Sequence, residues 1–278
     1  VLGLLVGVCA TARGNALLLL ALLPLLLVGR HAATGWRDGV RLVGWLWLGG
    51  VLAIAPVTVR NVVVGDDLVL LTSNAGVNLL IGQQAKYGGR FGPLSETPQF
   101  EFDPTGETLL EAELGRELRP SQVSRRLTRR ALARLASDPG EMLAHYGRKI
   151  YRFWSGYELP QIYSWNFWHD RLDPLRWFPV GAVWLLGPGL VGGALALRGP
   201  ARRLWLLLVL GWFASLVPFF PTSRYRQPIM GLLAIGVAAW LAAVVIRWRD
   251  GRRRQATLLV AAAALLLLAL WPDWSRLD

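Results

Sequence analysis

Long apolar runs separated by short polar connectors limit the fold of this chain more than any other feature. The runs at 204–220 and 229–246 are each about as long as an α-helix needs to cross a bilayer. Hydrophobic residues make up 54% of the 278, which is typical of a membrane protein. Three more such runs and two shorter ones lie at 42–59, 177–197, 256–271, 1–12 and 16–28. The sequence therefore predicts an all-α polytopic membrane protein with about six complete transmembrane helices and one partial helix.

The net charge of +12 lies mainly in the connectors. Residues 60–176 hold 15 basic and 14 acidic side chains, whereas the rest of the chain holds 15 basic and 4 acidic ones. A basic excess confined to short connectors indicates membrane topology rather than nucleic-acid binding. By the positive-inside rule, the connectors at 30–41, 198–203 and 247–254 are cytoplasmic, and residues 60–176 with the tail at 272–278 lie on the opposite face.

Residues 60–176 interrupt the apolar pattern over a stretch too long for a loop. We predict a mixed, mainly helical extracytoplasmic domain there, containing amphipathic helices. The other predicted domains are transmembrane helices at 1–59, four more transmembrane helices at 177–271, and an extracytoplasmic tail at 272–278. Because Val1 lies inside an apolar run, we expect the chain to be the C-terminal part of a longer protein, truncated within its first helices.

Short patterns within residues 60–176 predict its local structure. Aliphatic and β-branched residues at 62–64 and 68–71 favour a hairpin or an extended pair. Ser121 could cap a basic amphipathic helix, which we expect to lie on lipid headgroups. Asp138 followed by a proline at the first helical position predicts a capped helix start, and this helix should run to about Trp154.

Several common sites are absent from the sequence. Cys9 is the only cysteine, and the three histidines are scattered, so we predict no disulfide and no metal site. No nucleotide-binding glycine loop, GxSxG or HExxH motif occurs. Acidic side chains are missing from the interiors of the apolar runs, where an ion-coupled transporter would usually place some. We predict no cofactor and no nucleic-acid partner.

A polar break at 221–228 carries Arg224, Tyr225 and Arg226 between two apolar runs. Prolines at both ends of the break predict a non-helical turn, because proline lacks a backbone N–H and biases the residue before it away from helix. An arginine at the bilayer centre costs roughly 2.5 to 3.5 kcal/mol on insertion scales. The two arginines therefore either reach the lipid headgroups or form a fork that holds a phosphate. Arg13, at a break between the first two apolar runs, allows the same choice between an interfacial turn and a functional cation.

Two further groups of polar side chains are candidates for sugar binding. Asn74 and Asn78 lie four residues apart in a glycine-containing loop and could bind hydroxyl groups, although such residues more often form turns. Glu158 follows Tyr157 within an aromatic cluster at 151–177 that is typical of a membrane interface. Glu158 could bind a sugar or pair with the nearby arginine at position 152, and we favour the ion pair.

The order of short motifs along the chain carries a family resemblance. The motifs are Arg60-Asn61, Thr72-Ser73-Asn74-Ala75-Gly76-Val77-Asn78-Leu79, Ile81-Gly82, Asp138-Pro139-Gly140, Lys149, Phe153-Trp154, Tyr157-Glu158, and Ser223-Arg224-Tyr225-Arg226 with Pro228. This series resembles the second half of bacterial membrane glycosyltransferases with the GT-C fold. It is similar to the family 39 dolichyl-phosphate-mannose protein mannosyltransferases and to the aminoarabinose transferase that modifies lipid A. Val62 and Gln83 depart from the pattern, which commonly has an aromatic residue and an asparagine there.

The resemblance implies transfer of a sugar from a polyprenyl-phosphate carrier to a lipid, glycan or protein acceptor. The reaction would take place on the outer face of the bacterial cytoplasmic (inner) membrane, with the large loop periplasmic or extracellular. The family's catalytic acidic residue lies upstream of Val1, so the resemblance assigns none here. It implies a groove between spans for the prenyl chain. The implied donor phosphate-binding residues are Arg224, Arg226, Tyr225 and Arg13, and those for sugar or acceptor are Asn74, Asn78, Glu158 and Tyr157.

Two other classes of protein fit the same features. A non-enzymatic lipid-linked sugar flippase or cell-envelope assembly protein would have the same spans and topology charge. A ligase that joins a whole glycan to lipid would share the outer loop and the arginines.

Overall fold

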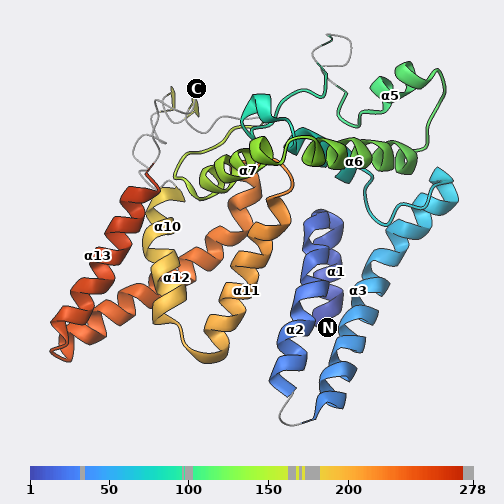
Figure 1. The fold of residues 1–278 in the computed structure, drawn as a ribbon. Coiled ribbons are helices and arrows are strands. Elements are labelled where there is room, and N and C mark those ends of the chain that lie inside the picture. Colours follow the sequence, from blue (N-terminus) through green and yellow to red (C-terminus); the bar gives the residue numbers. More distant parts are fainter. Residues whose placement is uncertain are drawn as a thin grey trace. The chain divides into compact units, whose positions relative to one another are not determined.

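The computed structural model describes residues 1–31, 35–95, 97, 103–161, 167–168, 171–172 and 182–271 (Figure 1). The regular structure of these residues is helical, in agreement with the predicted all-α class, and they contain no β-strand. The predicted tail at 272–278 and most of the aromatic cluster after residue 161 lie outside the described residues.

The chain forms two compact units. The first comprises Val1–Tyr87, Gly92–Leu143 and Gly211–Phe220, and the second comprises Gly88–Phe91, Ala144–Leu210 and Pro221–Asp278. These units are defined by which residues pack together. The domains predicted from the sequence were instead divided into membrane-spanning and extracytoplasmic segments. Those boundaries therefore stay predictions.

The first unit begins with helices α1 (Leu2–Ala12), α2 (Leu17–His31) and α3 (Trp36–Gly65). The predicted break between α1 and α2 is confirmed, because Arg13 is extended and a short 3₁₀ turn, η1 (Gly14–Ala16), follows it. Glycines allow α1 and α3 to pack closely: a Cβ atom on Gly3 would lie 2.1 Å from the carbonyl oxygen of Leu46. The Nε1–H of Trp47 in α3 donates to the carbonyl of Leu20 in α2 at 2.8 Å.

The extended pair expected at 62–64 and 68–71 is wrong, because 62–64 are the last residues of α3. The helix ends at Asp66, which adopts the left-handed conformation with φ of 47°. The chain then folds back along the last turns of α3. There Asn61 Nδ2 donates to the carbonyl of Val69 at 2.9 Å, and Thr58 Oγ1 donates to that of Leu70 at 2.8 Å. Helix side chains thus satisfy carbonyls that a partner strand would otherwise bind.

Helices α4 (Ala75–Gly82), α5 (Glu107–Leu114) and α6 (Pro120–Ser137) also belong to the first unit. Helix α6 buries an apolar stripe formed by Val123, Leu127 and Ala131. It packs on α4 so closely that a Cβ atom on Gly76 would lie 2.1 Å from the carbonyl oxygen of Ser124. The apolar face of α6, expected on lipid headgroups, is therefore covered by protein.

The start of α6 also differs from the prediction that Ser121 caps it. Arg119 is the N-cap residue, and Ser121 lies inside the helix. The backbone N–H of Ser121 donates to a carboxylate oxygen of Asp67 at 2.7 Å. A carboxylate from a distant segment thus satisfies an N–H group that has no partner within the helix.

The second unit contains most of α7 (Pro139–Trp154), α10 (Ala182–Val191), the π-helical turn η4 (Gly192–Ala196), α12 (Ser223–Arg249), α13 (Arg253–Ala269) and the larger part of α11 (Gly199–Leu216). Helix α10 packs against α12 and α13. A Cβ atom on Gly192 would lie 1.9 Å from the carbonyl oxygen of Gly236, so only glycine fits this contact. Helix α7 runs as predicted: Asp138 accepts a hydrogen bond from the N–H of Glu141 at 2.9 Å, and the helix ends at Trp154.

Two described helices, α3 and α12, are long and apolar enough to cross a membrane by length and composition. The apolar helices at 2–12, 14–28 and 182–196 are shorter. The runs at 204–220 and 256–271 form α11 and α13, which are not among these two. The predicted count of six complete spans therefore stays a prediction.

Candidate functional site

The segment 155–160, which follows α7, ties helix ends together in the second unit. The N–H of Gly156 donates at 2.8 Å to the carbonyl of Leu270, the C-cap residue of α13. The carbonyl of Leu159 accepts at 3.0 Å from the N–H of Ser223, the first residue of α12. These bonds use backbone groups that lack partners within the two helices.

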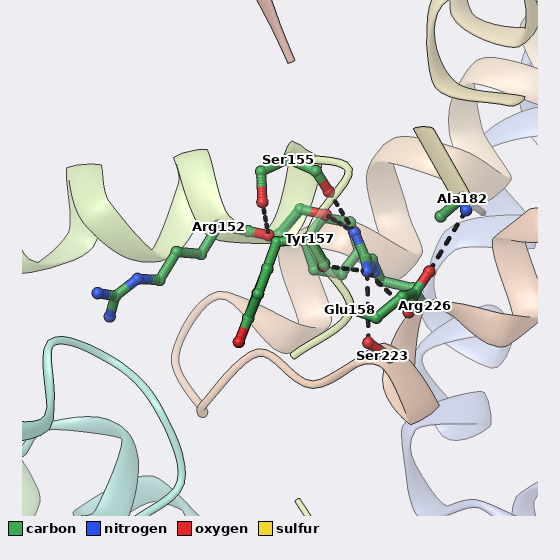
Figure 2. Close-up of polar contacts among 8 residues, drawn as sticks. Arg152, Ser155, Tyr157, Glu158, Ala182, Ser223 and Arg226 are labelled. Carbon is green, nitrogen blue, oxygen red and sulfur yellow. Dashed lines mark hydrogen bonds and ion pairs between the residues drawn. The ribbon is translucent and has the colours of Figure 1, made fainter. Parts of the chain in front are cut away.

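Glu158, in the same segment, links two more helices through its carboxylate. One oxygen accepts from the N–H of Ala182, the first residue of α10, at 3.3 Å. The other accepts from Arg226 Nη2 in α12 at 3.1 Å (Figure 2). A carboxylate at a helix N-terminus is stabilised by the unpaired N–H groups and the helix dipole.

Arg226 is the centre of this network and is only 1% exposed. Besides the Glu158 carboxylate, its guanidinium donates to the carbonyls of Phe153 at 3.3 Å and Tyr157 at 2.6 Å, and to that of Ser155. Figure 2 shows the guanidinium directed into the turn of chain that follows α7. The planar group therefore holds a turn of backbone together with several bonds in fixed directions.

The side chains of Arg224 and Arg226, predicted to form a phosphate fork, do not point the same way. The non-helical turn expected at 221–228 ends at Thr222, because α12 begins at Ser223 and includes Pro228. Residues two apart on a helix point to opposite sides. Arg224 is accordingly exposed and Arg226 buried, with Tyr225 partly exposed between them. The two Nη groups of Arg226 donate to the protein, whereas its buried Nε–H has no partner among the described residues. Of the two arginines, Arg224 presents its side chain to solvent.

The expected ion pair of Glu158 with Arg152 is also wrong. Arg152 donates instead to the carbonyl of Gly88, within the same unit. Figure 2 shows the Arg152 side chain extending away from Glu158, and the Tyr157 ring directed away from the Arg226 guanidinium. The Tyr157 carbonyl contributes to the network, whereas its ring does not.

The sugar-binding candidates of the first unit separate in the structure. Asn74 is the exposed N-cap residue of α4, and Asn78 is half-buried one turn later, so the expected loop is the start of a helix. Arg13, also in this unit, is half-buried at the break between α1 and α2. Arg13 and the asparagines thus belong to one unit, and Arg224 and Glu158 to the other.

Asn74 lines a small polar pocket in the first unit, with a volume of about 220 Å³. The end of α3, the segment that folds back along it, and the start of α6 form its walls. The lining residues are Asn61, Gly65, Asp67, Val69, Leu71, Thr72, Ser73, Asn74 and Pro120. Asn78 is not among them.

A second cavity, the apolar groove, lies within the second unit and has a volume of about 390 Å³. Side chains from α7, α10, η4, α11 and α13 line it, and all are aliphatic or aromatic. They are Ile150, Tyr151, Trp154, Leu190, Ala194, Trp205, Leu206, Val209, Leu210, Leu266 and Leu270. Trp154 and Leu270 lie at the helix ends that segment 155–160 ties together. The groove therefore reaches the polar end of the unit.

Searches of protein-family models, of curated proteins and of solved structures gave no match to this chain. The described residues also contain no group of three or more His, Cys, Asp or Glu side chains that could hold a metal ion.

Lys149 in α7 is a buried cation. From the sequence it was identified only as part of the motif series, and its burial was not predicted. Its side chain is 2% exposed, and its Nζ lies 4.4 Å from the centre of the Tyr146 ring. Burial lowers the pKa of Lys149 from 10.5 to about 7. The signal in the sequence is its spacing of four and seven residues from the buried Phe153 and Met142, which puts Lys149 on the inner face of the helix.

Proposed function

We propose that this chain is part of a membrane glycosyltransferase that moves a sugar from a polyprenyl-phosphate carrier to an acceptor outside the cytoplasmic membrane. The observation that carries the proposal is the apolar groove of the second unit. Inside a bilayer, lipid tails are as apolar as these side chains, so van der Waals packing holds a branched hydrocarbon chain in such a groove. The groove exposes very little polar surface, so it offers a sugar or a phosphate few hydrogen-bond partners and suits a hydrocarbon.

The polar end of the same unit supplies groups for the head of such a lipid. Arg224 lies in the first turn of α12, and its exposed guanidinium takes part in no hydrogen bond or ion pair within the described chain. A phosphate would accept charge-assisted bonds from it. Arg226 then has a positioning role: it fixes the segment beside which Arg224 lies. The proposal includes the multi-span topology, with the loop between α3 and α10 outside the membrane.

Sugar transfer is proposed from the resemblance of the sequence motifs, and binding of the lipid carrier is proposed from the groove. A lipid-linked sugar flippase needs the same groove. Transfer of the sugar to an acceptor therefore has to be measured separately from binding of the carrier.

The test compares two matched variants in η4. Ala194→Phe fills the groove, whereas Leu195→Phe alters the neighbouring side chain, which is 58% exposed and outside the lining. The full protein in nanodiscs is incubated with a radiolabelled polyprenyl-phosphate sugar and membrane extract. We expect label to move to an acceptor in the parent protein and in Leu195→Phe, with at least a tenfold loss of carrier binding and transfer in Ala194→Phe.

Three results separate the possibilities. Binding without transfer, over a range of sugars and acceptors, would favour the flippase. Equal binding by Ala194→Phe and Leu195→Phe would remove the groove as the site of the hydrocarbon chain. Loss of transfer in Arg224→Gln, with the fold intact, would support the phosphate role of Arg224.

A further inference from the structure

We infer that the polar pocket of the first unit binds one neutral sugar ring. The pocket lies between the end of α3, the segment 67–74 and the start of α6. The inference rests on the proposed function for the choice of a sugar among neutral polyhydroxylated ligands. The lining residues and the volume of the pocket indicate a neutral, polyhydroxylated ligand of about one ring.

Several hydrogen-bonding groups in the pocket remain available to a ligand. The side chains of Thr72, Ser73 and Asn74 line it and make no hydrogen bond to the described part of the protein. They provide two hydroxyl groups and one carboxamide, which can all both donate and accept. Sugar hydroxyls also donate and accept, so each can bind any of these groups.

Asn61 adds an acceptor in a fixed orientation. Its Nδ2 donates to the carbonyls of Val69 at 2.9 Å and Leu71 at 3.4 Å. Because both partners are carbonyls, the amino side of the amide must face them, and Oδ1 is left to accept a bond from a ligand. The side chain is thereby held in place before a ligand binds, which reduces the entropy lost on binding.

The charge of the residues that line the pocket favours a neutral ligand over an anion. Asp67 is the one charged residue that lines it, and no arginine or lysine is among the lining residues. Asp67 already accepts the N–H of Ser121 at 2.7 Å. A phosphate or a carboxylate in the pocket would lie beside this carboxylate, and no lining residue supplies a cation for it. A neutral ligand meets no such penalty.

The pocket has room for a single ring. Its volume of about 220 Å³ is below the range of roughly 300 to 1,000 Å³ that is usual for drug-sized ligands. Val69, Leu71 and Pro120 provide an apolar wall for the C–H groups of the ring. A lining with both hydrogen-bonding and aliphatic groups suits a pyranose, which carries both O–H and C–H groups.

The experiment measures binding of neutral methyl pyranosides by calorimetry and saturation-transfer NMR, without any lipid carrier. The panel contains the gluco, manno, galacto and xylo forms, with methyl glucuronoside and inorganic phosphate as anionic probes. We expect at least one neutral glycoside to bind at least tenfold more tightly than either anion. Thr72→Val and Asn74→Leu should each weaken that binding at least tenfold, since both remove hydrogen-bonding groups at similar volume.

Asn78→Leu is the matched control, because Asn78 lies on the same helix outside the lining. Equal affinity in Asn74→Leu and Asn78→Leu, or tighter binding of phosphate than of every glycoside, would overturn the inference. Because no carrier is present, glycoside binding can persist if the transferase proposal fails. Loss of glycoside binding with carrier-dependent transfer intact would refute the pocket alone.

Discussion

The carboxylate of Glu158 lies 3.1 Å from Nη2 of Arg226, in a pair whose side chains are 17% and 2% exposed. The pair joins the segment after α7 to the first turn of α12, and the second carboxylate oxygen reaches the first N–H of α10. Removing one partner of a buried ion pair leaves the other charge uncompensated, which is more costly than losing an exposed pair.

Arg226→Met should therefore lower the stability of the second unit by about 3 to 5 kcal/mol. Arg224→Met, two residues away on the exposed side of α12, should change stability by less than about 0.5 kcal/mol. Thermal unfolding in detergent, followed by tryptophan fluorescence, measures the difference. Equal unfolding temperatures of the two variants would show that the network adds little to stability.

Because Lys149 is buried, we expect the protein to become more stable as the pH rises. Its pKa in the folded protein is about 7, below the ordinary 10.5, so the unfolded chain binds more protons between these two values. The free energy of unfolding should rise from pH 7 to about pH 10.5, by on the order of a few kcal/mol, and should be insensitive to this group below pH 7.

Lys149→Met should remove that rise, since methionine has no proton to lose. Arg148→Met, at the exposed neighbouring position, should retain it. Chemical denaturation across this pH range gives the slope of stability for each variant. The same slope in all three proteins would contradict a buried Lys149.

Asp67 predicts an acidic loss of stability. Desolvation by itself raises the pKa of Asp67, but the hydrogen bonds from Ser121 and the charges of Arg119 and Arg125 outweigh it, so the pKa lies below 3.8. The stabilisation is present above pH 3.8 and is lost as the pH falls through the lower folded-state value.

Asp67→Asn should cost about 0.5 to 2 kcal/mol at neutral pH, because it weakens the cap of α6. Asp66→Asn is the matched control: the Asp66 side chain is 85% exposed, and its ion pair with Arg119 is at the surface. Acid titration of unfolding should show a shallower decline in Asp67→Asn alone. A decline that is equally steep in both variants would place the acid sensitivity elsewhere.

Two glycines of α12 should respond in opposite directions to alanine. A Cβ atom on Gly236 would lie 2.1 Å from the carbonyl oxygen of Gly189, whereas one on Gly231 would meet nothing within 4 Å. Gly236→Ala should destabilise the contact with α10 by about 1 to 3 kcal/mol. Gly231→Ala should gain about 0.5 to 1 kcal/mol, since alanine is the better helix former. Thermal unfolding of both variants tests the packing of α10 on α12, and destabilisation by neither would refute it.

The multi-span topology can be tested with single cysteines. In a Cys9→Ser background, Glu117→Cys should react with a membrane-impermeant maleimide in intact spheroplasts. Arg202→Cys and Asp250→Cys, at exposed positions in or next to the predicted cytoplasmic connectors, should react only after the membrane is opened. Labelling of all three in intact cells would contradict the predicted orientation.

The sequence by itself determined where helices form and where several of them begin. The apolar runs became helices because a peptide backbone in an apolar setting must satisfy its own hydrogen bonds. The break at Arg13 and the start of α7 at Asp138 were also predictable, since both depend on residues adjacent in the chain. Proline in the break at 221–228 was a weaker guide, because Pro228 lies close enough to the start of α12 to be included in the helix.

Only the tertiary structure decided which polar groups meet. Arg226 binds a segment that lies 68 to 73 residues earlier in the chain, and Ser121 binds an aspartate 54 residues earlier. The spacing of neighbouring residues in the sequence does not predict such distant partners. The pairing of Glu158 with Arg226 rather than Arg152, and the convergence of Asn61 and Asn74 on one pocket, follow from how the helices pack. A polar group leaves water only where the fold brings a partner to it, and that is a property of the packed chain.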